Sequence, residues 1–170
     1  PFCEHVELVA IDLQEVNEEF PPRNRGIWDE LIKTQSVCVF GEDLSKTLKP
    51  FPLEGMIGHS YYLAKDLHRL PEFFEEDKDD PEEMAATCGW ICRRIVRSGF
   101  DLVMMQEKKF TRDLYLCWES FSKHYPGQKT NMFEVLNLCL NPVSDVREIS
   151  IILDRITPWL LAEIDKEILQ

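Results

Sequence analysis

From residue 52 onward, apolar side chains recur at steps of three and four residues. At this spacing side chains return to the same face of an α-helix, so the pattern predicts about five helices in this part of the chain. Their apolar faces must be buried against one another, which favours a mainly α helical bundle. We expect the core of this bundle to include Ile91, Ile95, Leu102, Trp118, Phe121, Leu136, Ile152 and Ile156.

Several helix boundaries can be predicted from capping residues. Asp80 is suited to cap a helix that begins at Pro81, and Glu83 would complete a capping box. Thr111 and Ser144 are expected to cap two later helices. Prolines are expected to start a new turn or to kink a helix at two places, Pro71 and Pro158.

Only two segments have the composition of a strand, residues 5–12 and residues 37–40. Two short strands do not form a stable sheet by themselves. They either pair as a ribbon against the helices or form the edge of a sheet whose other strands lie elsewhere. We favour the second interpretation, because the chain begins almost inside a strand. We therefore expect residues 1–50 to be part of an α/β domain, with two or three short strands, and residues 51–170 to form the helical bundle.

The charge balance excludes some functions. Acidic residues outnumber basic ones by 31 to 19, which gives a net charge of -12 and argues against general nucleic-acid binding. No apolar run approaches the roughly 20 residues that cross a membrane. No signal peptide is visible, although the first residue is Pro1, and the sequence leaves open whether other residues precede it.

The chain has six cysteines and no CxxC pair, so a structural zinc site is not expected. Cys88 and Cys92 are four residues apart within an apolar pattern. Small buried thiols are typical of a reducing compartment, so a cytoplasmic location is expected.

An acidic stretch occupies residues 72–83, with eight carboxylates and one lysine. These carboxylates could hold a metal ion, but a solvated connection between two helices is the favoured interpretation. Its Asp-x-Asp, at residues 77–79, follows no strand or glycine turn and is not expected to bind a metal.

A basic cluster stands out in this acidic chain. Arg93, Arg94 and Arg97 lie on one predicted helix, and Thr111 and Arg112 lie at the start of the next. Arginine binds oxyanions with two parallel hydrogen bonds, and a helix start can also receive an anion, so these residues are candidates for binding phosphate or carboxylate. The alternative is a solvated face that pairs with the acidic stretch, and the sequence leaves both open. No complete catalytic constellation is present, and the catalytic residues are unknown.

Two segments carry a resemblance to a known family. Residues 33–44 (KTQSVCVFGEDL) follow a strand and a short helix and precede the helices, and residues 110–115 (FTRDLY) precede His124-Tyr125-Pro126. Together they resemble the C-terminal half of bacterial nucleotidyltransferase-domain proteins, a polymerase-β-like superfamily that includes the kanamycin-nucleotidyltransferase type.

The resemblance implies transfer of a nucleoside monophosphate from a nucleoside triphosphate to a hydroxyl group, with Mg²⁺ as cofactor. The acceptor would be a small molecule or a protein side chain. In such proteins an α/β domain carries a Gly-Ser turn and an Asp-x-Asp pair, a later strand adds a third carboxylate, and a helical domain closes over nucleotide and acceptor. Glu7 is similar in placement to the third carboxylate, although it could equally be an ordinary exposed strand residue.

The chain departs from the family pattern, because the Gly-Ser turn and the strand-borne Asp-x-Asp are absent. We therefore expect this chain alone to be inactive, because the metal site would be incomplete. The alternative function is a non-enzymatic, all-α protein-interaction module. No membrane partner is expected under either hypothesis, and a homodimer is possible.

Overall fold

The computed structural model describes residues 32–33, 36–47 and 60–168 of the chain. The chain divides into two compact units, Pro1–Gly55 and Met56–Gln170. The predicted strand at residues 5–12, and Glu7 within it, lie outside the described residues.

The segment predicted as a second strand, residues 37–40, has no strand conformation. Val37, Val39 and Phe40 are 84%, 93% and 96% exposed. A strand is stabilised by pairing with a neighbour and by burying one face. Neither condition is met here among the residues that the structure describes, so the prediction is wrong for this segment. The sheet-edge hypothesis as a whole depends on residues outside that part and stays a prediction.

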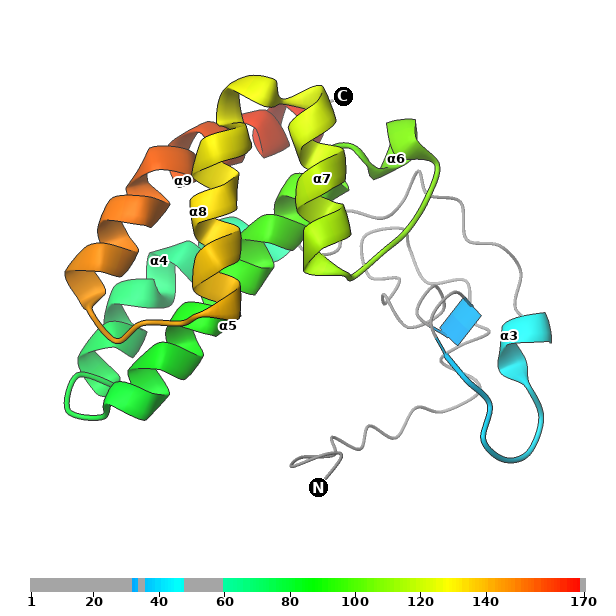
Figure 1. Cartoon of the computed structure of the whole chain (residues 1–170), viewed down its shortest axis with the longest axis horizontal. Coiled ribbons are helices and arrows are strands. Elements are labelled where there is room, and N and C mark those ends of the chain that lie inside the picture. Colours follow the sequence, from blue (N-terminus) through cyan, green and yellow to red (C-terminus); the bar gives the residue numbers. More distant parts are fainter. Residues whose placement is uncertain (1–31, 34–35, 48–59, 169–170) are drawn as a thin grey trace. The chain divides into compact units, whose positions relative to one another are not determined.

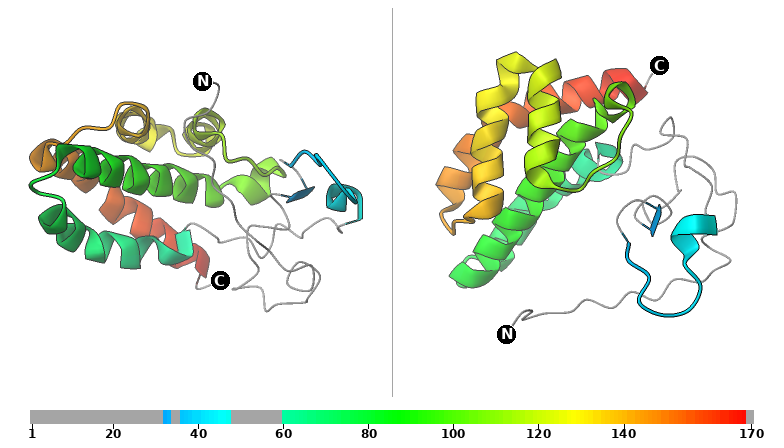
Figure 2. Two further views of the ribbon diagram at one scale, coloured as in Figure 1. Left: turned by 90° about the horizontal axis from the view of Figure 1, so that it is seen from below. Right: turned by 45° about the vertical axis from the view of Figure 1, so that its right-hand side comes forward.

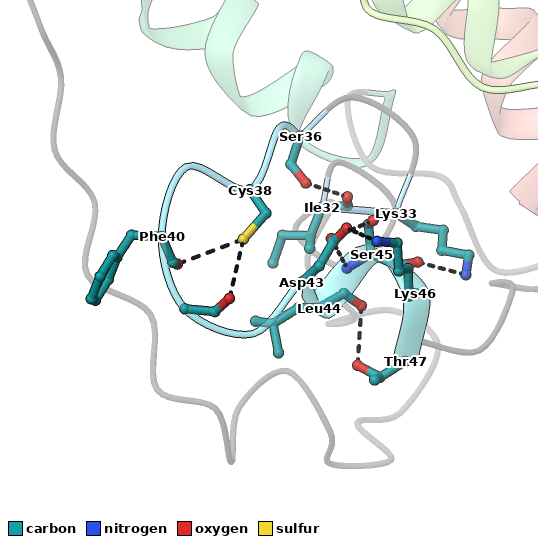
Figure 3. A network of polar contacts seen from close by, with 11 residues as sticks. Ile32, Lys33, Ser36, Cys38, Phe40, Asp43, Leu44, Ser45, Lys46 and Thr47 are labelled. Carbon is teal, nitrogen blue, oxygen red and sulfur yellow. Dashed lines mark hydrogen bonds and ion pairs between the residues drawn. The ribbon is translucent and has the colours of Figure 1, made fainter.

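In the described part of the first unit, a network of polar contacts surrounds the short helix α3, Leu44–Thr47 (Figure 3). The carboxylate of Asp43 accepts hydrogen bonds from the backbone N–H of Ser45 at 3.2 Å and from its hydroxyl at 2.6 Å. Lys46 lies 3.1 Å from the same carboxylate. The bonds from Ser45 and Lys46 lower the pKa of Asp43. Asp43 is therefore the local cap of α3.

The second unit is a helical bundle, as predicted. Its elements, in chain order, are α4 (Ser60–Glu76), α5 (Pro81–Asp101), α6 (Met104–Glu107), α7 (Leu114–His124), the 3₁₀ turn η2 (Pro126–Gln128), α8 (Lys129–Leu140) and α9 (Val146–Ile168). Helix α5 is central and contacts α4, α7, α8 and α9. Figures 1 and 2 show α7 and α8 crossing one side of α5, with α4 on the other side.

The predicted core is largely confirmed. Six of the eight expected residues are buried: Ile91, Ile95, Leu102, Phe121, Leu136 and Ile156. Trp118 and Ile152 are only half-buried. Helix α7 places Cys117, Ser120 and Phe121 inward, which leaves Trp118 at the border of the core. There its indole N–H donates a hydrogen bond to the backbone carbonyl of Lys129 at 3.2 Å.

Aspartates cap three of the described helices of the bundle, α5, α7 and α9. Asp80 caps α5, as predicted, by accepting hydrogen bonds from the backbone N–H groups of Glu82 and Glu83. The reciprocal half of the capping box is absent, because the N–H of Asp80 donates to the carbonyl of Asp77 at 2.9 Å. The backbone N–H of Asp80 is therefore already bonded within the turn before α5 and does not need the side chain of Glu83.

Two cap predictions are corrected. Helix α7 is capped by Asp113, which accepts from the N–H of Leu116 at 2.9 Å, and not by Thr111. At α9, Asp145 and not Ser144 accepts hydrogen bonds from the N–H groups of Arg147 and Glu148. In each case a carboxylate lies closer to the first turn, where it also interacts favourably with the helix dipole.

Two prolines lie inside helices. Pro71 lies inside α4, so the prediction that it starts a new turn is wrong. Helix α9 continues through Pro158, and the kink expected there stays a prediction. A proline inside a helix removes one backbone hydrogen bond. Burial of nearby apolar residues offsets that loss: Leu63 and Leu70 precede Pro71 on α4, and Ile156 and Leu160 flank Pro158 on α9. None of the described helices is long and apolar enough to cross a membrane.

Candidate functional site

Arg97 and Arg112 form the centre of the candidate site. Arg97 lies on α5, and Arg112 lies in the segment that leads into α7. Both residues are half-buried, and the Nε atom of each is buried without a hydrogen-bond partner. Neither guanidinium makes an ion pair within the described residues.

The two guanidinium groups are close enough to affect one another. Burial, and then the positive charges of Arg112 and Arg93, lower the pKa of Arg97. Arginine nevertheless stays protonated at neutral pH. Two adjacent cations with desolvated Nε atoms are unfavourable unless an anion or water compensates them. A bound oxyanion would offset this cost.

Arg93 lies one helical turn before Arg97 and contributes a third positive charge. Its Nη1 atom is 3.0 Å from the position that a Cβ atom would take at Gly89. The side chain therefore folds back over Gly89, because that residue has no side chain of its own. The charges of Arg93 and Arg112 both lower the pKa of Arg97, so these three predicted site residues interact electrostatically.

Arg94, unlike Arg97 and Arg112, has an acidic partner. Its Nε atom lies 2.9 Å from Oδ2 of Asp66, which joins α5 to α4. This contact is an ion pair and not a well-formed hydrogen bond, since the same Oδ2 atom has no hydrogen-bond donor. Arg94 also lies 5.9 Å from the ring centre of Trp90. A partner is therefore already present for Arg94, and it is not a member of the acidic stretch.

Thr111 is adjacent to Arg112 but is occupied by local contacts. Its hydroxyl accepts a hydrogen bond from the N–H of Asp113 at 3.1 Å. The start of α7 is filled by the Asp113 carboxylate, which takes the place that an external anion would need there. Arginine side chains, and not the helix start, are therefore the groups available to an anion.

Four buried thiols, two of which interact with the charge of Arg97, lie on α5, α7 and α8. The Cys117 and Cys139 thiols are near enough to Arg97 to interact with its charge. Burial raises the pKa of Cys117 to about 12. Cys92 interacts with both Cys88 and Cys139: hydrogen bonding from Cys92 lowers the pKa of Cys88 to about 7, and the pKa of Cys92 itself is raised. All four thiols are reduced and buried.

A separate ion cluster surrounds Glu107 at the end of α6. Its carboxylate lies 2.9 Å from Nε2 of His124, 3.3 Å from Nζ of Lys109 and 3.9 Å from Nζ of Lys123. The hydrogen bonds from His124 and Lys109 are the main reason that the pKa of Glu107 is lowered. This cluster joins α6 to the end of α7 and uses its charges internally.

The acidic stretch is the turn between α4 and α5 and the adjoining helix ends. Four of its members have internal partners. Glu72 pairs with Arg69 and Glu75 with Lys78, Asp77 accepts a hydrogen bond from Thr87 at 2.7 Å, and Asp80 caps α5. Among the described residues, no group of three or more His, Cys, Asp or Glu side chains is arranged to hold a metal ion. The proposed Mg²⁺ ligand Glu7 lies outside those residues.

No known protein family, curated protein or solved structure matches this chain.

Sequence reasoning found the arginines but missed their different surroundings. Arg94 and Arg97 are three residues apart on α5, yet Asp66 of α4 pairs with one and Arg112 approaches the other. The spacing within one helix cannot show which neighbouring helix each arginine meets. The Glu107 cluster was missed for the same reason, since its four members come from α6, from α7 and from the segment that joins them.

Proposed function

We propose that this chain is the helical, nucleotide-holding part of a nucleotidyltransferase-like protein, in which Arg97 and Arg112 bind a phosphate group. The observation that carries the proposal is that Arg97 and Arg112 are half-buried, interact through their charges and lack an acidic partner in the described part of the chain. Arg93 adds to the positive potential, and Arg94 holds α5 against α4. That the phosphate belongs to a nucleotide, and that the acceptor is a hydroxyl group, is proposed from the family resemblance.

The chain by itself is proposed to bind nucleotide without transferring it. A metal site built from carboxylates is needed to position Mg²⁺ and to neutralise the triphosphate. The purified 170-residue chain should therefore release no pyrophosphate from ATP in the presence of Mg²⁺. Robust turnover would show that catalytic groups were overlooked.

Calorimetric titration tests the binding part of the proposal, with inorganic phosphate, pyrophosphate and ATP as separate probes. Binding should strengthen from phosphate to pyrophosphate to ATP if a nucleotide is the ligand. Arg97→Gln and Arg112→Gln should each weaken ATP binding by roughly 10-fold or more, because a hydrogen bond to a charged group is worth about 1.5–3 kcal/mol. Equal binding of phosphate and ATP would support an oxyanion site but contradict a nucleotide site.

A matched control separates binding from general charge. Arg155 is exposed and pairs with Glu134 on another part of the bundle. Arg155→Gln should change ATP affinity by less than about twofold, since an exposed pair contributes little. Without ligand, Arg97→Gln should leave the melting temperature unchanged or raise it, because it removes repulsion and a desolvated charge. A large loss of stability together with unchanged ATP binding would assign Arg97 a structural role.

A further inference from the structure

A groove of about 540 Å³ separates parts of α4 and α9. Its floor is apolar, with Leu70 and Leu153 only 6% and 3% exposed. Leu67, Phe74 and Val146 are half-buried and form its walls. The two helices lie side by side in Figures 1 and 2, so the groove belongs to one surface of the bundle.

The sequence explains why this space is not filled. On α9 the groove is lined by Ser150 and Thr157, whose short side chains leave room between the helices. On α4 it is lined by Pro71, whose compact ring replaces a longer side chain. An apolar floor beneath small residues leaves space for side chains from outside.

The groove is bordered by negative charge. Glu75 and Asp154 line it together with Lys78, which pairs with Glu75. Asp154 makes no ion pair within the described residues. The acidic stretch at residues 72–83 continues from the same end of α4 and carries eight carboxylates against one lysine. A cationic partner would therefore be attracted to this border.

We propose that the groove binds a basic amphipathic helix from another protein. The lining residues of α9 extend from Val146 to Thr157, which is about 16 Å at 1.5 Å per residue, or about three helical turns. A helix that places apolar residues at positions i, i+3 or i+4, and i+7 would fill the floor, as in other helix-in-groove complexes. Its lysines or arginines would face Glu75, Asp154 and the acidic stretch.

Fluorescence anisotropy with labelled peptides tests this proposal on the full chain. The probes are a helical Leu/Lys peptide of about five turns, a scrambled peptide of the same composition, and a helical Leu/Glu peptide. Only the first should bind, and binding should weaken when NaCl is raised from about 0.05 to 0.5 M. Equal binding of the scrambled peptide would reduce the interaction to charge alone, and equal binding of the Leu/Glu peptide would overturn the charge argument. No binding of any peptide would overturn the proposal.

Substitutions of groove residues test whether the peptide binds in the groove. Thr157→Trp should fill the space and weaken binding by at least roughly 10-fold, since it displaces the apolar contacts of the peptide. Asp154→Lys should weaken binding by about threefold or more, whereas Asp165→Lys, an exposed charge reversal elsewhere on α9, should change it less than about twofold. Ser150→Trp repeats the filling test if Thr157→Trp loses its helical circular dichroism. Full binding by a folded groove-filled variant would overturn the proposal.

Discussion

Gly99 is a position on α5 where side chains of α7 and α8 approach the backbone closely. A Cβ atom there would lie 2.6 Å from Cε of Met132 and 3.1 Å from Cδ2 of Phe121. The end of Met132 can move, but the buried Phe121 ring has little freedom. Glycine is therefore needed at this position for packing, although it weakens the helix.

We predict that Gly99→Ala lowers the free energy of unfolding by about 1–2 kcal/mol, because overpacking exceeds the gain in helix propensity. Gly89→Ala is the matched control within the same helix. Its nearest contact, at 3.0 Å, is the flexible end of Arg93, so the change should be less than about 1 kcal/mol. Urea denaturation of both variants provides the comparison. A stabilised Gly99→Ala protein would mean that α5 packs less tightly on α7 and α8 than the distances indicate.

Glu107 should make stability depend on pH in the acid range. Its pKa in the folded chain is lowered from 4.5 by His124 and Lys109. A lowered pKa means that the contribution of the carboxylate is fully present above about pH 4.5 and is lost as the pH falls through the folded pKa. Glu107→Gln should therefore reduce the melting temperature at pH 7, and its difference from the parent chain should shrink below pH 4.5.

The control for Glu107 is Glu119→Gln, which alters an exposed carboxylate that has no ion pair among the described residues. Its melting temperature should follow that of the parent chain at every pH. If both variants behave alike, the contacts around Glu107 do not contribute to stability.

At the scale of single elements, the aspartate caps allow a direct comparison. Asp145 accepts two backbone N–H bonds at the start of α9, at 2.8 and 3.3 Å, whereas the neighbouring Ser144 is exposed and makes no hydrogen bond to that turn among the described residues. Asp145→Ala should lower the free energy of unfolding by about 1 kcal/mol, and Ser144→Ala should lower it by less than about 0.5 kcal/mol. Thermal denaturation of the two variants distinguishes the caps, and a larger loss for Ser144→Ala would contradict the assignment.

The helices could be predicted from the sequence because their signals are local. The apolar spacing around Ile91 and Ile95, and Asp80 before Pro81, depend only on neighbours within a few turns. The capping residue of α7 does not follow from the sequence alone, because Thr111 and Asp113 are both suitable caps. The path of the backbone determines which of them reaches the first turn.

Long-range features could not be predicted in this way. The segment at residues 37–40 has strand composition, but a strand requires a partner whose position no local pattern gives. The same holds for the site: the arginines were visible in the sequence, but the approach of Arg112 to Arg97 depends on how α7 packs on α5.

At the scale of the whole molecule, the division into two units predicts that the bundle folds independently. The second unit contains its own core, with buried residues contributed by α4, α5, α7, α8 and α9. A fragment of residues 56–170 should therefore unfold cooperatively and keep a melting temperature within about 5 °C of the full chain. Circular dichroism measures both properties. A fragment without a cooperative transition would show that the first unit is needed for folding.

The central position of α5 also has a kinetic consequence. Because this helix contacts each of the other long helices, its middle turns cannot open until most of the bundle has separated. Backbone amides around Ile91 and Ile95 should therefore exchange with deuterium more slowly than those of the exposed turn at residues 78–80. If they exchange only through global opening, their rates report the unfolding equilibrium of the whole bundle without any denaturant.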